Sequence, residues 1–205
     1  ALTLTEIILL LLGRAPLFDT LTITFGTAGT GGFGIKNDSM AGYSPYIQIV
    51  VTIFMILFGI NFSAYFLILR KKFKQALSME EVRCYLAIIL VSILIITLVL
   101  SDMYPVWEAL RHAAFQVGSI ITTTGYSSAD FGLWPVIPRS ILVTLMFIGA
   151  CAGSTGGGIK VSRLIILLKS VRKELHLMLH PRSVKKLRMD GRVLEPEVIR
   201  TTSAF

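Results

Sequence analysis

The sequence has few charged residues and few cysteines for its length of 205 residues. Only 16% of its residues are charged, whereas 54% are hydrophobic, and the mean hydropathy is +0.73. A disordered chain or a simple soluble enzyme is excluded, because a water-soluble fold needs more polar residues to cover its surface. The apolar excess predicts contact with lipid, and the length then allows only a few spans of about 20 residues each. The two cysteines, Cys84 and Cys151, lie in or beside apolar runs and indicate neither a disulfide framework nor a metal site.

Basic residues are concentrated in two segments of the chain. Sixteen of the twenty lysines and arginines lie within residues 70–83 and 160–200. Basic segments beside apolar spans are typical of cytoplasmic loops, so both segments are expected to face the cytoplasm. The net charge of +8 is therefore interpreted as a signature of membrane orientation. Nucleic-acid binding is not expected, because no aromatic or groove-reading pattern accompanies the charge.

Three apolar stretches approach or exceed the length needed to cross a membrane. Residues 45–69 are expected to form one helix running from outside to inside, and residues 85–101 a helix that returns outward. A third helix is expected over residues 134–172, broken by a glycine-rich stretch. The predicted class is an all-α integral membrane protein that crosses the inner membrane of the cell several times.

Two shorter segments, residues 16–26 and 105–118, fit neither a full span nor a soluble loop. Each opens with a proline, which favours the first turn of a helix. At about 1.5 Å per residue, each covers only about half of the hydrocarbon thickness of a bilayer. Glu108, Arg111 and His112 also argue against contact with lipid. The pattern predicts half-helices that re-enter the membrane, with an interfacial amphipathic helix as the alternative.

Each half-helix is followed by a loop rich in glycine and threonine, at residues 27–34 and 121–127. The two loops match when one is shifted by 93 residues along the chain. The matched pairs are Thr30 with Thr123, Gly32 with Gly125, Phe33 with Tyr126, and Gly34 with Ser127. An internal repeat of half-helix, loop and outgoing helix is therefore present twice.

These loops predict a cation filter. Glycine permits an extended backbone whose carbonyl oxygens can replace the water shell of a monovalent cation, and threonine hydroxyls can extend that array. The carbonyl end of each half-helix carries the negative end of its dipole, which also favours a cation. Replacing Gly125 by serine is expected to add a side chain where only hydrogen fits, and so to alter selectivity. The candidate ligands are Gly29, Thr30, Gly31, Gly32 and Phe33 in the first loop, and Thr122, Thr123, Thr124, Gly125 and Tyr126 in the second.

The half-helix, glycine loop and outgoing helix resemble the repeated unit of the Trk/Ktr/HKT superfamily of potassium transporters, and the Trk type in particular. The most specific point of resemblance is the motif GACAGSTGGGIK at residues 149–160. The resemblance implies potassium transport, with Gly32 and Gly125 as the family's filter glycines. It also implies that the chain holds the second and third of four repeats around one pore, with residues 173–205 leading into the next. A natural half-length protein that dimerises is the alternative.

In that family the glycine-rich stretch forms a loop beneath the filter and acts as a gate. Five glycines in ten positions, each costing about 1 kcal/mol against alanine, cannot hold a stable helix. Close packing by small residues is the alternative, whereas a phosphate-binding loop lacks the required pattern. Lys160 is expected either to tune the gate or to extend to the cytoplasmic interface. The candidate gate residues are Gly149, Ala150, Cys151, Ala152, Gly153, Ser154, Thr155, Gly156, Gly157, Gly158 and Lys160.

Expected partners are membrane lipid, a second copy in a homodimer and, by resemblance alone, a cytoplasmic nucleotide-binding regulatory subunit. No cofactor is expected, and potassium is the transported ion. His176 and His180 share a helical face and could share a metal, but no third ligand stands nearby. They are interpreted as part of a basic interfacial helix.

Several functions remain open beside a potassium channel. A sodium-permeable pore or an ion-coupled symporter of the same family could share these loops. A membrane-embedded enzyme could use Asp102, Glu108 and His112 as acid and base groups, although no positioned nucleophile accompanies them. A scaffold without transport activity is a further alternative.

Overall fold

The structure, a computed structural model, describes residues 1–180, 187–194, 197 and 200–202. The all-α class is confirmed, since the one pair of strands in the described residues is a two-residue antiparallel ladder between β1 and β2. The parts of the expected cytoplasmic segment at residues 181–186 and near the end of the chain lie outside the described residues. The elements are α1 (Leu2–Leu12), α2 (Leu17–Ala28), α3 (Pro45–Phe58), α4 (Phe62–Leu69), α5 (Phe73–Ser78), α6 (Glu80–Leu100), α7 (Val106–Ile121), η1 (Phe131–Leu133), α8 (Val136–Phe147), α9 (Val161–Leu179), β1 (Arg188–Met189) and β2 (Arg192–Val193).

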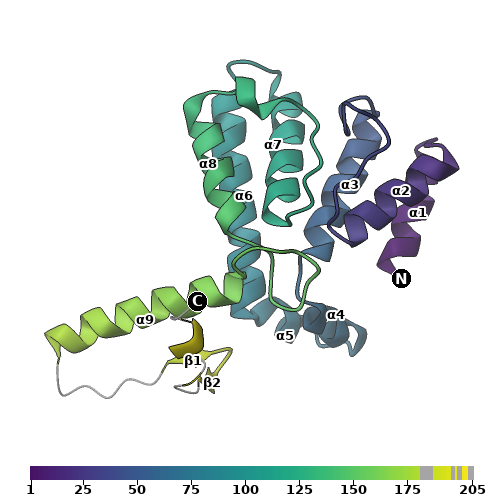
Figure 1. Cartoon of the computed structure of the whole chain (residues 1–205). Helices are drawn as coiled ribbons and strands as arrows, with labels where there is room; N and C mark the ends of the chain where they lie inside the picture. Colours follow the sequence, from purple (N-terminus) through teal and green to yellow (C-terminus); the bar gives the residue numbers. More distant parts are fainter. Residues whose placement is uncertain (181–186, 195–196, 198–199, 203–205) are drawn as a thin grey trace.

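The helices form two similar groups that follow each other along the chain (Figure 1). Helices α1, α2 and α3 pack on one another, and so do α6, α7 and α8. The two groups meet where α3 packs against α7. In each group a first helix is followed by a second helix, a loop and an outgoing helix, which is the order that the internal repeat predicts.

The two helices expected to re-enter the membrane, α2 and α7, begin directly after Pro16 and Pro105. Proline suits this position because the first turn of a helix has no partner for its N–H groups. Their 12 and 16 residues extend only about 18 and 24 Å, at about 1.5 Å per residue. After α7 the chain turns and runs back along the helix toward η1 (Figure 1). Helix α2 ends two residues beyond its expected end at residue 26, and α7 ends three residues beyond its expected end at residue 118.

Residues 45–69 do not form the single helix expected from their hydropathy. Helix α3 ends at Phe58 and α4 begins at Phe62, and the two are bent by 92°. The physical reason lies in Gly59 and Asn61. Gly59 follows the last turn of α3, and the side chain of Asn61 caps α4 by accepting a hydrogen bond from the N–H of Ser63 at 2.8 Å.

The outgoing helix of the second repeat is also interrupted. Helix α8 ends at Phe147 and α9 begins at Val161, with residues 149–158 outside any helix. Helix α9 then leaves at a steep angle to α6 and α8 (Figure 1). Both repeats therefore break their outgoing helix, the first over three residues and the second over thirteen.

The two basic segments come together at one end of the molecule. Helices α4 and α5, which follow the first break, lie at the same end as α9 (Figure 1). Lys169 of α9 forms an ion pair with Glu80 of α6, and Asp190 accepts a hydrogen bond from the N–H of Glu80 at 2.7 Å. The two basic segments thus lie on the same side of the molecule.

Among the described residues, α6 is the one helix long and apolar enough to span a membrane by itself. The bent pair α3 and α4 passes the same test together, and α1 and α8 are shorter apolar helices. Leu90, Leu94 and Leu98 follow one stripe of α6 and are exposed. An exposed row of large apolar side chains suits contact with lipid.

Candidate ion pathway

The two loops expected to form filters have matching backbone conformations. Thr30 and Thr123, which are equivalent in the repeat, have φ angles of 50° and 58°. Gly32 and Gly125 have φ angles of 66° and 88°. Positive φ is uncommon for threonine, so its recurrence at both sites identifies the loops as copies of one unusual structure. The repeat therefore extends from the sequence to the backbone.

Backbone carbonyl groups in both loops are left without a hydrogen-bond donor. Among the described residues, no donor reaches the carbonyl oxygens at three consecutive positions of each loop. The positions are Thr30, Gly31 and Gly32 in the first loop, and Thr123, Thr124 and Gly125 in the second. These positions are equivalent under the repeat. Carbonyl groups are obligatory acceptors, so six free ones in two matched sets are available for water or a cation.

The threonine hydroxyl groups of the loops donate their hydrogens to nearby groups, which leaves their oxygen lone pairs as acceptors. The Thr122 hydroxyl donates to the carbonyl of Gly118 at 2.7 Å and lies 2.8 Å from the hydroxyl of Thr124. The Thr30 hydroxyl donates to the carbonyl of Gly29 at 2.8 Å. These hydrogen bonds hold the loops in shape.

Tyr126 connects the second loop to the back of the first. Its side chain is buried, with 1% of its surface exposed. Its hydroxyl reaches the carbonyls of Ile23 at 3.3 Å and Phe33 at 3.4 Å. A Cβ atom on Gly26 would lie 2.2 Å from that hydroxyl, so only glycine leaves room for it. Phe33, the partner of Tyr126 in the repeat, is instead 81% exposed, because no described residue covers it.

The two filter glycines are constrained in different ways. A Cβ atom on Gly32 would lie 1.9 Å from the carbonyl oxygen of Thr124, so Gly32 is sterically required. A Cβ atom on Gly125 would meet no atom within 4 Å. The expectation that only hydrogen fits at Gly125 is therefore wrong. What requires glycine there is the φ angle of 88°, which other residues rarely adopt.

The glycine-rich loop at residues 149–158, here called the gate loop, is closed at its neck. Ile148 and Ile159 form an isolated β-bridge, and the N–H of Gly149 donates to the carbonyl of Ile159 at 2.8 Å. A Cβ atom on Gly149 would lie 2.0 Å from the carbonyl oxygen of Gly157. The two backbone segments of the neck thus lie too close together for a side chain at Gly149.

The gate loop contacts both filter loops. The N–H of Gly157 donates to the hydroxyl of Thr123 at 2.7 Å. The hydroxyl of Thr30 shares its one hydrogen between the carbonyl of Gly29 and, at a longer distance of 3.2 Å, the carbonyl of Thr155. Both contacts use the threonine that has positive φ in its own filter loop. The three loops therefore meet at equivalent points of the two repeats.

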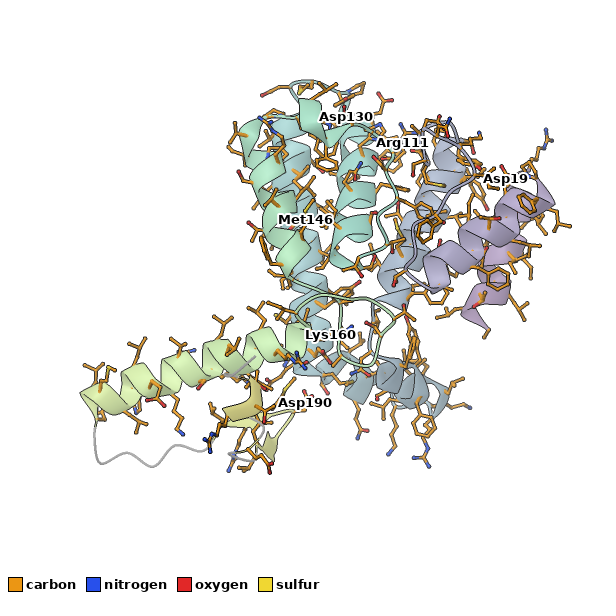
Figure 2. All side chains as sticks on the ribbon, viewed as in Figure 1. Asp19, Arg111, Asp130, Met146, Lys160 and Asp190 are labelled. Atoms are coloured by element: carbon orange, nitrogen blue, oxygen red, sulfur yellow. The ribbon has the colours of Figure 1, made fainter. Side chains whose placement is uncertain are left out.

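Lys160 lies at the corner where the gate loop enters α9 (Figure 2). Its ammonium group donates to the carbonyl of Gly156. Of the two expected roles, this contact favours an action on the gate loop over extension to the interface.

Two residues that touch the gate loop were not recognised from the sequence. Glu81 accepts a hydrogen bond from the N–H of Ala152 at 2.5 Å, and Asn61 donates to Glu81 at 3.0 Å. In the sequence, Asn61 is a polar residue within the apolar stretch of residues 45–69. A glycine two residues before an asparagine is a helix stop followed by a cap, and that signal could have located the break.

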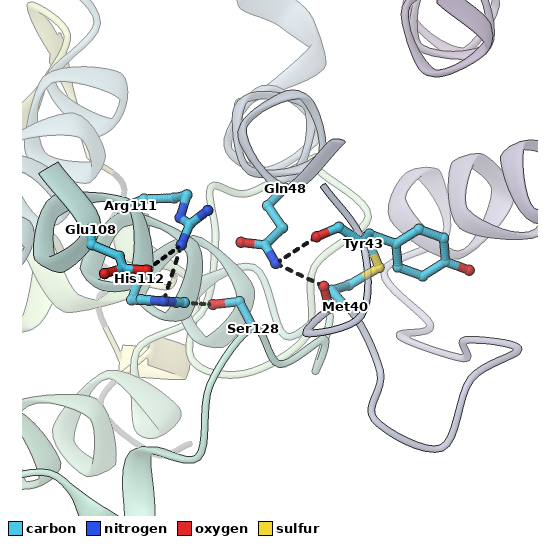
Figure 3. A network of polar contacts seen from close by, with 7 residues as sticks. All are labelled: Met40, Tyr43, Gln48, Glu108, Arg111, His112 and Ser128. Atoms are coloured by element: carbon cyan, nitrogen blue, oxygen red, sulfur yellow. Dashed lines mark hydrogen bonds and ion pairs between the residues drawn. The ribbon is translucent and has the colours of Figure 1, made fainter. Parts of the chain in front are cut away.

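The polar residues near the start of α7 form a structural network (Figure 3). Arg111 pairs with Glu108 at 3.3 Å and lies 3.4 Å from the ring of buried His112. His112 is bonded to the hydroxyl of Ser128 at 3.0 Å. Asp102, the third group of the enzyme alternative, is exposed in the turn after α6 and has no part in this network. The acid and base groups are thus used to hold the loop after the second filter.

Gln48 performs a similar task in the first repeat (Figure 3). Its buried amide donates to the carbonyls of Met40 at 2.9 Å and Tyr43 at 3.2 Å. The N–H of Met40 in turn donates to the carbonyl of Ser127 at 2.9 Å. The two segments that leave the filters are therefore fixed to each other.

The rings of His176 and His180 stack with their centroids 4.7 Å apart. In the part of the chain that the structure describes, no group of three histidine, cysteine or acidic residues could hold a metal ion. The pair therefore has no support as a metal site among these residues.

The chain is similar to known transport proteins. Residues 5–204 match the TrkH family, described as cation transport protein. The Trk system potassium uptake protein TrkH of Halomonas elongata is 36% identical over 187 residues, which are 89% of this chain and 38% of that protein. The TrkH protein of Salmonella typhimurium is 34% identical over 93% of this chain and 40% of its own length.

A solved structure shows the same fold. The potassium transporter TrkH from Vibrio parahaemolyticus matches with a TM-score of 0.92 and 30% identity, over 99% of this chain and 45% of that one. The chain spans about two fifths of the length of the curated relatives that it matches. The family is one of transporters, which disfavours the enzyme alternative. The resemblance drawn from the sequence is confirmed: the chain belongs to the TrkH family of cation transport proteins.

Proposed function

We propose that this chain contributes two of the filter loops of a membrane pathway that conducts potassium into the cell. The relatives are named as potassium uptake proteins, which favours potassium as the ion. The observation that carries the proposal is the pair of equivalent carbonyl sets at residues 30–32 and 123–125, which accept no hydrogen bond among the described residues. Such carbonyl oxygens can replace the water around a potassium ion.

The gate loop is proposed to regulate passage below the filters. It contacts Thr30 and Thr123 directly, so an ion leaving the filters meets it next. Its glycines let the backbone adopt more than one conformation at low cost. Opening requires the loop to leave these two threonines, which breaks their hydrogen bonds to Thr155 and Gly157.

The proposed orientation follows from the shared basic surface of α5 and α9. Lys72 and Lys74 belong to the start of α5, and Arg172 and Lys173 belong to α9. These helices lie at the same end of the molecule, which would face the cytoplasm, as the positive-inside rule predicts. The filters would then open to the outside. A homodimer and a cytoplasmic regulatory subunit remain proposals, with the surface of α9 as the place for the subunit.

The experiment is potassium flux into liposomes that contain the purified protein expressed from its complete gene. Uptake of rubidium-86 driven by a potassium gradient should exceed that of empty liposomes. Sodium should compete weakly, whereas strong competition would favour the sodium-permeable alternative. Dependence of the flux on a proton or sodium gradient would favour a symporter, and absence of any flux would contradict the proposal.

A further inference from the structure

Glu81 occupies a central position below the gate loop. It is the second residue of α6 and is 3% exposed. One carboxyl oxygen accepts hydrogen bonds from the N–H groups of Ala152 at 2.5 Å and Ser162 at 3.2 Å. The other accepts a hydrogen bond from the side-chain amide of Asn61 at 3.0 Å. A single side chain therefore holds the gate loop, the start of α9 and the break between α3 and α4.

The two helix breaks also contact each other beside Glu81. The N–H of Cys151 donates to the carbonyl of Gly59 at 3.1 Å. The N–H of Phe62 donates to the carbonyl of Gly153 at 3.3 Å. The breaks of the two repeats thus form one joint, and Glu81 is the ionisable side chain bonded on both sides of it. Both of these contacts join backbone atoms. The side chain of Glu81 adds bonds to the joint that depend on the identity of the residue.

We propose that Glu81 is the positioning residue that keeps the gate loop against the filters by bonding to Ala152 and Ser162 from a fixed helix. This proposal rests on the proposed function of the gate loop. The first N–H groups of a helix have no partner within it, so Ser162 needs an acceptor from elsewhere. The positive end of the α9 dipole also attracts a carboxylate. A displacement of Ala152 or Ser162 relative to α6 breaks these bonds, so they oppose movement of the gate loop out of its place against the filters.

Glutamine in place of Glu81 has the same size but cannot satisfy these donors. Its amide has one acceptor oxygen and one donor nitrogen. If the oxygen faces Ala152 and Ser162, the nitrogen faces the amide nitrogen of Asn61. If the oxygen faces Asn61 instead, the N–H groups of Ala152 and Ser162 lose their acceptor. The Glu81→Gln variant therefore tests the hydrogen bonds without removing volume.

Cys151 provides a direct reading of the position of the gate loop. It lies within the loop and is 0% exposed. In protein whose other cysteines, including Cys84, are replaced by alanine, maleimide should react with Cys151 only when the loop moves. Because hydrogen bonds to a charged group contribute about 1.5–3 kcal/mol, Glu81→Gln should raise the labelling rate about tenfold or more.

Glu80→Gln is the matched control. Glu80 is the neighbouring residue on the same helix and pairs with Lys169 instead of the gate loop. Its substitution should leave the labelling rate of Cys151 unchanged. A labelling rate in Glu81→Gln equal to that of the wild type would overturn the proposal, and so would an equal rise in both variants.

If the Glu81→Gln variant does not fold, a second variant tests the same hydrogen bonds. Asn61→Ser keeps an oxygen that can cap α4 at Ser63 but loses the donor to Glu81. It should raise labelling several-fold, and no rise would count against the proposal.

Potassium flux through the same samples separates the role of Glu81 from the proposed function of the gate loop. Faster labelling without any wild-type flux supports Glu81 as a positioning residue and contradicts the proposed function.

Discussion

The hydroxyl of Thr123 accepts a hydrogen bond from the N–H of Gly157 at 2.7 Å, which joins the second filter loop to the gate loop. The same threonine has a φ angle of 58° and a carbonyl group without a donor among the described residues. One residue thus takes part in both the proposed filter and its contact with the gate loop. We therefore expect a displacement of the gate loop to change the proposed filter.

Thr123→Val keeps the shape of the side chain and removes the acceptor for Gly157. Leaving that N–H without a partner costs about 1–3 kcal/mol in the closed arrangement, so basal potassium flux should rise several-fold. Flux into liposomes measures this. Thr144→Val, which removes an exposed hydroxyl bonded within α8, is the control and should not change flux. Unchanged flux in Thr123→Val would show that the contact does not restrain the loop.

Tyr126→Phe should weaken the connection between the two filters. The change removes a hydroxyl that reaches the first filter at Phe33 and keeps the buried ring. A loss of about 1 kcal/mol in stability is expected, together with a lower preference for potassium over sodium. Thermal unfolding and ion competition provide the two measurements. Tyr46→Phe removes a partly exposed hydroxyl bonded to Leu9 and should change neither.

Gly149→Ala should disrupt the neck of the gate loop. The new Cβ atom would lie 2.0 Å from the carbonyl oxygen of Gly157, so the backbone must shift. We expect loss of regulated flux and a lower melting temperature. Gly118→Ala is the comparison, because its Cβ atom would meet Ile56 at 3.4 Å and because alanine favours a helix by about 1 kcal/mol. Equal tolerance of both changes would contradict the closed neck.

Lys160→Met should loosen the gate loop at its end. The substitution retains most of the length of the side chain and removes the donor to Gly156. Basal flux should increase, whereas Lys74→Met, an exposed position on α5, should leave it unchanged. If Lys160 served only to reach the interface, the two variants would behave alike.

Much of the fold could be predicted from the sequence because the same residue types recur at equivalent positions of the two repeats. Prolines begin both half-helices, and Thr30 and Thr123 recur with their glycines at a fixed spacing. The break between α3 and α4 was missed because hydropathy averages over Gly59 and Asn61. The repeat could have corrected this, since the second outgoing helix was expected to break and the first is its copy.

The contacts of the site could not be predicted in the same way. Glu81 accepts a hydrogen bond from Ala152, which is 71 residues away in the sequence, and no local sequence pattern predicts a contact at that separation. The roles of the threonine hydroxyls depend on rotamers that sequence does not encode. The space around Gly125 likewise depends on how distant segments pack, so its strict need for glycine was attributed to the wrong cause.

The most direct test of the account is the ion preference of the Gly125→Ser variant, because this position has room for a side chain but requires positive φ. Potassium uptake is measured in bacteria that lack their own potassium transport, with sodium and rubidium as competitors. The wild type should prefer potassium, and Gly125→Ser should remain folded and lose about tenfold or more of that preference, since a strained φ costs about 1–3 kcal/mol in the filter. An unchanged preference for potassium in a well-expressed Gly125→Ser protein would contradict the assignment of this loop as a filter.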